Sequence, residues 1–125
     1  MSAPHPILGV WEVTADGAPF AHHVMVFHPD GTALQSNPDR GNPDTSDSNG
    51  IGTWRAEGEM VTGAFLEFVV DRSDRDLVNK GIISFELEVT DDRFSGSATV
   101  RFYDLTGELR RGPSTSRLTG IRFTA

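Results

Sequence analysis

The stretch Leu8-Gly9-Val10-Trp11 and the end of the chain, Thr119-Gly120-Ile121-Arg122-Phe123, together decide the fold that the sequence predicts. In a closed up-and-down barrel with an even number of strands, the first and last strands are antiparallel neighbours. Trp11 and Arg122 would then meet at one rim, where a guanidinium over an indole contributes roughly 0.5–2 kcal/mol. We therefore expect this pair to close one end of a β-barrel.

The composition of the chain fits one all-β domain over residues 1–125. The chain contains 13 Gly and 7 Pro and is 37% hydrophobic, a mixture typical of many strands joined by tight turns. It contains no Cys, which excludes disulfides, thiol catalysis and cysteine metal sites.

The charge and the apolar runs limit the partners of the protein. The net charge of -7 argues against binding to DNA or RNA. No apolar run approaches the ~18–20 residues of a membrane span, and the first residues lack the basic start and apolar core of a signal peptide. We expect a soluble cytoplasmic protein that contacts neither nucleic acid nor membrane.

Turn signals recur at the short spacing of an all-β chain and predict eight strands. Eight strands close into a small barrel that holds one ligand or a packed interior. Pro113 cannot donate to a strand ladder, so the last strand either bulges there or begins after it. The predicted strands cover residues 7–14, 20–28, 32–36, 51–56, 60–72, 77–89 and 93–104, with the last one following the turn at 105–108.

Two strands have a clear alternation of apolar and polar residues. In the first, the predicted inward set is Ile83, Phe85, Leu87 and Val89. In the second, it is Phe94, Gly96, Ala98, Val100 and Phe102. The small residues in the middle of the second set would leave a hollow at mid-height of the barrel.

The run from residue 64 to 70 is apolar on both faces, which leaves its orientation open. Leu66, Phe68 and Val70 form the cleaner apolar row and are expected inside. Phe65 and Val69 would then face outward with Glu67 and form a subunit interface, which predicts a homodimer or small homo-oligomer. In the alternative orientation, Glu67 points inward as a carboxyl group with a raised pKa.

Residues 36–50 form the one long irregular segment of the sequence. Loops of this length are usually functional or disordered. Lying between two strands of a small barrel, the segment could cover the open mouth as a lid or remain a solvated loop.

One strand carries three histidines, but their spacing does not suit a metal site. His22 and His28 would lie about 20 Å apart at ~3.3 Å per residue, and His23 points to the opposite face. If Phe27 packs inside, His23 faces the lumen and is the best candidate for a general acid–base residue. The structural alternative is a histidine hydrogen-bonded near the rim. No fingerprint of a metal or organic cofactor is present, so none is expected.

Several segments in order resemble a known family: Gly9-Val10-Trp11, Phe27-His28-Pro29-Asp30-Gly31-Thr32, Gly50-Ile51-Gly52-Thr53-Trp54 and Thr119-Gly120-Ile121-Arg122. Together they resemble the small lipocalin-like (calycin) barrels and, within these, the allene oxide cyclase-like barrels of actinobacteria. The resemblance implies an eight-stranded antiparallel barrel, often dimeric or trimeric, with a deep apolar lumen. Some members bind hydrophobic ligands, and others cyclise a polyene or an epoxide held in a fixed pose.

We therefore expect a cofactor-free cyclase or isomerase of specialised, polyketide-like metabolism that holds a small hydrophobic substrate in the lumen. The alternative is a non-catalytic carrier of a small hydrophobic ligand. A packed barrel that serves as an interaction module is a third possibility. His23 would supply the polar contact, and the predicted substrate-binding wall is Met25, Trp54, Phe85, Leu87, Ala98, Val100 and Phe102.

Overall fold

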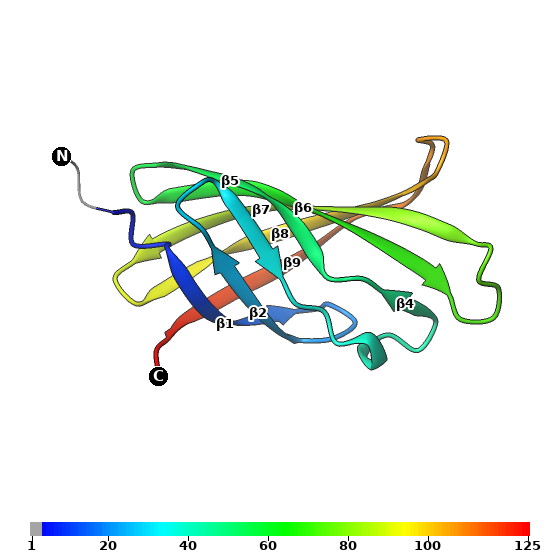
Figure 1. The fold of residues 1–125 in the computed structure, drawn as a ribbon, viewed down its shortest axis with the longest axis horizontal. Helices are drawn as coiled ribbons and strands as arrows, with labels where there is room; N and C mark the ends of the chain where they lie inside the picture. Colours follow the sequence, from blue (N-terminus) through cyan, green and yellow to red (C-terminus); the bar gives the residue numbers. More distant parts are fainter. Residues whose placement is uncertain (1–3) are drawn as a thin grey trace.

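The computed structural model describes residues 4–125 of the chain and consists almost entirely of β-strands (Figure 1). One 3-10 turn, η1 (Asp39–Gly41), interrupts them. Among the described residues, no helix has the length and apolar character needed to cross a membrane. The strands are β1 (Gly9–Asp16), β2 (His22–Phe27), β3 (Thr32–Gln35), β4 (Thr45–Asp47), β5 (Gly50–Glu57), β6 (Met60–Asp71), β7 (Val78–Thr90), β8 (Arg93–Asp104) and β9 (Leu109–Phe123).

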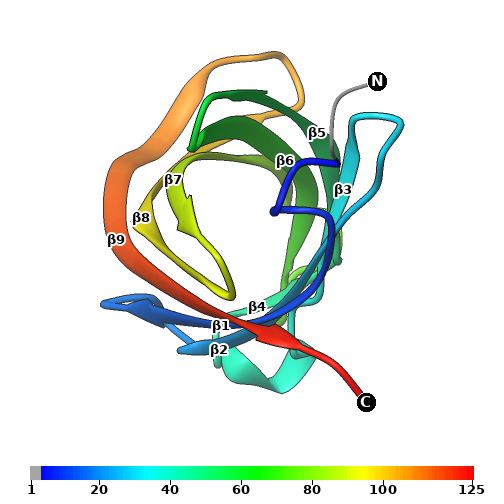
Figure 2. The same ribbon diagram turned by 90° about the vertical axis from the view of Figure 1, so that its left-hand side faces the viewer.

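The strands form a closed antiparallel barrel, as predicted. β1 pairs with β9 and β6 pairs with β7, so the sheet closes on itself into the ring seen in Figure 2. β7 occupies one edge of β6 along most of its length, and β5 and β4 pair end to end with the other edge. β4 and β5 therefore act together as one interrupted strand along that edge of β6. The barrel has eight strand positions and up-and-down connections.

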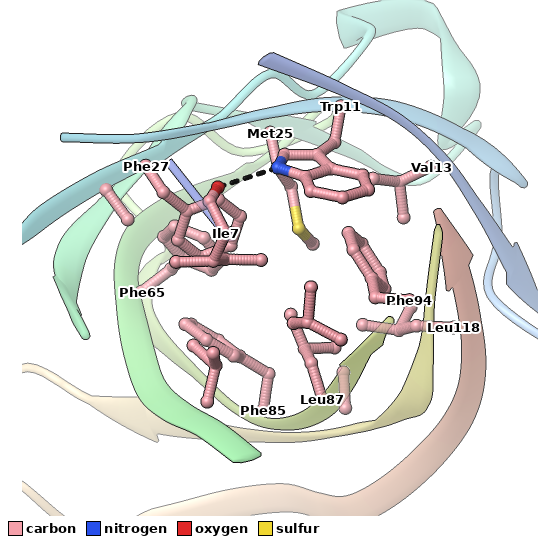
Figure 3. Packing of buried hydrophobic residues seen from close by; sticks show 14 of the residues in the cluster. Ile7, Trp11, Val13, Met25, Phe27, Phe65, Phe85, Leu87, Phe94 and Leu118 are labelled. Atoms are coloured by element: carbon pink, nitrogen blue, oxygen red, sulfur yellow. Dashed lines mark hydrogen bonds between the residues drawn. The ribbon is translucent and has the colours of Figure 1, made fainter. Parts of the chain in front are cut away.

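Trp11 and Arg122 close one end of the barrel, as the sequence predicts. They are register partners on β1 and β9, and the guanidinium carbon lies 4.5 Å from the indole ring centroid. The indole Nε1 donates a hydrogen bond of 2.8 Å to the carbonyl of Ile7, in the segment that precedes β1 (Figure 3). The chain that enters the barrel is thereby tied to the strand that leaves it.

Substituting Arg122→Ala should lower the free energy of unfolding by about 2–3 kcal/mol. Besides the stacking on the indole, this side chain donates hydrogen bonds to the carbonyls of Leu8 and Pro6 and to the carboxylate of Asp92. Urea unfolding followed by Trp fluorescence measures the loss. Arg117→Ala removes an exposed arginine from the same strand and serves as the control. Equal unfolding midpoints for the two variants would contradict the closure of the barrel by Arg122.

A cluster of buried apolar side chains fills the barrel beside the closed end (Figure 3). It includes the predicted inward residues of β7, which confirms the orientation of that strand. On β2 the inward side chains change from Phe27 and Met25 to His23, and on β3 they change from Ala33 to Gln35. The interior therefore becomes less apolar toward the other end of the barrel.

The predicted orientation of β6 is wrong. Phe65, Val69 and Glu67 are buried, whereas Leu66 and Phe68 are each 42% exposed on the outer surface. Both faces of the strand are apolar, so its neighbours decide the orientation. The interior offers aromatic partners, and the ring centroid of Phe65 lies 5.0 Å from that of a phenylalanine on β7. A subunit interface formed by Phe65 and Val69 is thereby excluded.

Candidate functional site

A cavity of about 670 Å³ occupies the barrel between the apolar cluster and the open end. This volume is within the range of sites that bind small molecules. In Figure 1, the open end lies on the side of β4, where the β6–β7 and β8–β9 hairpins extend beyond β1–β3. The apolar part of the wall includes Ala15, Phe20, Ile83, Ala98, Val100 and Leu118.

Half of the residues predicted from the sequence border this cavity. His23, Ala98, Val100 and Phe102 line it. Trp54 packs against the apolar cluster from its edge and donates its indole NH to the carbonyl of residue 28, at 3.0 Å. The remaining predicted residues, Met25, Phe85 and Leu87, are members of the apolar cluster and lie deeper in the barrel.

Glu67 is the buried carboxyl group of the site, with only 6% of the residue exposed. Its partner across the ladder is Gly81, and a Cβ at that position would lie 2.9 Å from the Glu67 Cγ. The absence of a side chain at Gly81 therefore makes room for the carboxyl group. Burial, together with the smaller effect of the Asp47 charge, raises the pKa of Glu67 to about 7, against a lowering by the hydrogen bond from Asn37.

Asn37 holds this carboxyl group and links it to the segment at the mouth. Its side-chain NH₂ donates to Glu67 Oε2 and to the carbonyl of Ser48, the latter at 2.9 Å. Its Oδ1 accepts a hydrogen bond of 3.0 Å from Gln35 Nε2, and its backbone NH donates to Asn49 Oδ1 at 3.0 Å. Asn37 therefore fixes both ends of the irregular segment to the barrel wall.

The segment between β3 and β5 borders the cavity rather than extending into solvent. It contains η1 and β4, and β4 pairs with residues 69–71 of β6. Asn42, Pro43 and Thr45 contribute to the wall of the cavity. Arg72 holds the segment from outside by donating to the carbonyls of Asn42 and Asp39. The irregular segment at residues 36–50 therefore lies at the cavity, which is the position that a lid over the mouth would require.

His23 points into the barrel, as its phase with Met25 and Phe27 predicts. Its Nδ1 lies 3.2 Å from the carbonyl oxygen of Ser36, and its Nε2 lies 3.2 Å from that of Phe20. Burial lowers the pKa of the imidazole, against an opposite effect of these hydrogen bonds. Neutral His23 carries one N–H and donates it to one of these two carbonyls, whereas the imidazolium form can donate to both. Each ring nitrogen thus faces a backbone carbonyl, and His23 would have to turn from one of them to exchange a proton with a ligand.

Sequence reasoning missed several polar residues of the wall, among them Gln35, Asn37 and Arg111. Gln35 could have been found, because it alternates in phase with Ala33 on a short strand. Asn37 lies just beyond that strand, where the pattern ends. Arg111 reaches the cavity only because β9 bulges between it and residue 114. A metal centre is not formed: residues 4–125 contain no group of three His, Asp or Glu side chains arranged to hold an ion.

The closed eight-stranded antiparallel barrel, with one plugged end and a cavity at the other, is consistent with a calycin-like barrel. No protein-family model matches the chain, and no significant match was found among curated proteins or solved structures. The finer resemblance to allene oxide cyclase-like barrels therefore remains a prediction.

Proposed function

We propose that this protein is an allene oxide cyclase-like barrel that acts as a cofactor-free cyclase or isomerase on a small hydrophobic molecule held in the cavity. The observation that carries the proposal is the carboxyl group of Glu67, buried in the wall of a cavity lined in large part by apolar side chains. A carboxyl group in such surroundings exchanges a proton with a bound molecule more readily than one in water.

The state of Glu67 suits proton transfer in both directions. With a pKa of about 7, its neutral and anionic forms are both populated at neutral pH. Within residues 4–125, Asn37 is the side chain that hydrogen-bonds to it, through Oε2, so Oε1 remains available to a ligand. The anionic form would take a proton from one carbon of the substrate, and the resulting acid would return it at another atom. Such an isomerisation needs no further reactant.

His23 is the other candidate for acid–base chemistry, but its two backbone contacts favour a role in shaping the wall. A non-catalytic carrier remains the alternative function. A carrier needs only the cavity, and the hydrogen bond between Asn37 and Glu67 would then hold the lid segment in place. Turnover of a bound molecule distinguishes the two functions.

The base-catalysed ring opening of nitrobenzisoxazole tests the proposal with a defined probe. A base removes the proton on the ring carbon, the N–O bond breaks, and the product is the isomeric cyanonitrophenol, which is followed by its absorbance. We expect kcat/KM to rise with pH and level off above about 7, because the carboxylate is the active form. Glu67→Gln should lower kcat/KM by about 100-fold or more.

Glu88→Gln removes a solvent-exposed carboxyl group from β7 and should leave this rate unchanged. Binding of a neutral fluorescent dye shows whether the cavity of each variant is intact. A parent protein that binds the dye but opens the probe no faster than free carboxylate would favour the carrier. An unchanged rate for Glu67→Gln would contradict the assignment of Glu67.

Assembly as a homodimer remains a proposal, as do the cytoplasmic location and the role in polyketide-like metabolism. The exposed apolar side chains of β6 that a partner subunit could cover are Leu66 and Phe68, in place of the pair first expected. Ile51 on β5 is the register partner of Leu66 and is exposed as well, so the apolar surface extends across two strands.

A further inference from the structure

The segment that precedes β1, residues 4–8, covers the closed end of the barrel and is called the entry segment here. Figure 2 shows it reaching into the opening of the ring. Ile7 is fully buried and belongs to the apolar cluster, and its carbonyl accepts the hydrogen bond from the Trp11 indole (Figure 3). The carbonyls of Pro6 and Leu8 accept hydrogen bonds from Arg122. One side of the entry segment is therefore fixed to β1 and β9.

The imidazole of His5 holds the other side of the entry segment. Its Nε2 lies 2.8 Å from the carbonyl oxygen of Gly58, in the turn between β5 and β6. Its Nδ1 accepts a hydrogen bond of 3.0 Å from the backbone NH of Ile7. His5 thus joins the entry segment to the β5–β6 turn and also provides the acceptor for a backbone donor beside the core.

These two contacts require one protonation state of His5. A backbone NH can only donate, so Nδ1 carries no proton when it accepts from Ile7. A carbonyl can only accept, so Nε2 carries the proton of the neutral ring and donates it to Gly58. An imidazolium would direct an N–H from Nδ1 toward the NH of Ile7. The two donors would oppose each other, and the NH of Ile7 would lose its acceptor.

The charged groups on the two sides of the entry segment would draw an imidazolium away from it. Gly58 lies between two exposed glutamates, whose carboxylates attract a cation toward the β5–β6 turn and solvent. The guanidinium at the opposite side of the segment repels one, although a carboxylate 2.8 Å away partly balances its charge. The charged side chains concerned are Glu57 and Glu59 in the β5–β6 turn, and Asp91, Asp92 and Arg122 at the opposite side.

We propose that His5 is an acid-sensitive latch: protonation of its ring releases the entry segment from the β5–β6 turn and opens the closed end of the barrel. A histidine suits this role because its charge changes in the range between about pH 5 and 8. Arg122 stays charged over this range and keeps the other side of the segment attached. Opening would expose Ile7 and the indole of Trp11, and would give the apolar cluster a second access to solvent at the end opposite the cavity.

Hydrogen exchange of the backbone NH of Ile7, followed by NMR and corrected for the intrinsic effect of pH, tests this inference. Protection in the parent should fall about tenfold or more between about pH 8 and pH 5. His5→Asn should keep the protection at both pH values, because an asparagine oxygen accepts from the NH two residues on and does not titrate. His5→Ala should show low protection at both. His22→Asn, the same change at an exposed histidine, should behave as the parent.

The amide of Leu87, in the middle of the apolar cluster, shows whether the barrel stays folded and should remain protected at both pH values. Loss of its protection together with that of Ile7 would indicate general unfolding and would overturn the inference. Equal protection of Ile7 in the parent at both pH values, or a His5→Asn variant that responds to pH as the parent does, would overturn it as well. None of these measurements depends on the cavity or on Glu67, so the proposed function is tested separately.

Discussion

Replacing Glu67 with glutamine should raise the free energy of unfolding by about 3 kcal/mol at pH 8, but by less than about 1 kcal/mol at pH 5. In the folded protein, burial raises the pKa of this carboxyl group from 4.5 to about 7. Between these two values, the folded state keeps a proton that the unfolded state has released. The stability of the parent protein therefore falls as the pH rises through this interval.

Glutamine does not ionise, so the variant lacks this contribution to the pH dependence. Above pH 7 the parent must ionise a buried group, and the variant avoids that cost. Urea unfolding of both proteins at pH 5 and pH 8 measures the difference. Glu88→Gln, at an exposed position, is the matched control and should follow the parent. Identical pH dependence for the parent and Glu67→Gln would show that Glu67 is not desolvated in the folded protein.

Substituting Ala98→Phe should weaken ligand binding by about 100-fold or more while leaving the barrel folded. Ala98 lies on β8 and faces the interior of the barrel, where it borders both the apolar cluster and the cavity. A phenyl ring at this position would occupy space that the ligand needs. The affinity for decanol measures the effect, and urea unfolding shows whether the fold survives.

Two further variants make this result specific. Thr99→Phe places the same ring on the outer side of the same strand and should leave the affinity unchanged. Ser116→Leu enlarges the register partner of Ala98 from the β9 side of the cavity and should also weaken binding. Unchanged affinity in Ala98→Phe would place the ligand outside this cavity. Overpacking of a filled interior would instead cost about 1–3 kcal/mol of stability.

The barrel itself could be predicted because its signals are local or involve the two chain ends. Alternation along residues 83–89 identified the buried face of β7, and closure of an even-stranded barrel brought Trp11 to Arg122. The eight strand positions followed from the turns. β4 was not predicted, because three polar residues in an irregular segment carry no alternation, and only their pairing with β6 makes them a strand.

The site was predicted in part, and the missed residues have physical reasons. Glu67 lies on a strand that is apolar on both sides, so periodicity could not show which face is buried. The space over Gly81, on a different strand, is what accommodates its carboxyl group. Arg111 was not predicted, because a bulge in β9 shifts the inward–outward alternation by one residue. Pro113 indicated an irregularity in this strand, but not which side chains it would turn inward.

The buried members of the apolar cluster that also border the cavity are Ala15, Ile83, Ala98 and Leu118, and Ala18 and Val100 pack against the cluster at the same level. Most of the packing that holds the barrel together therefore lies away from the residues that would touch a ligand. Mutations at outer wall positions such as Ser114, which lies outside the cluster, can alter ligand preference with little loss of mutational robustness. This separation makes the barrel a suitable starting point for directed evolution toward new ligands, because selection can vary the binding half while the closed half preserves the fold.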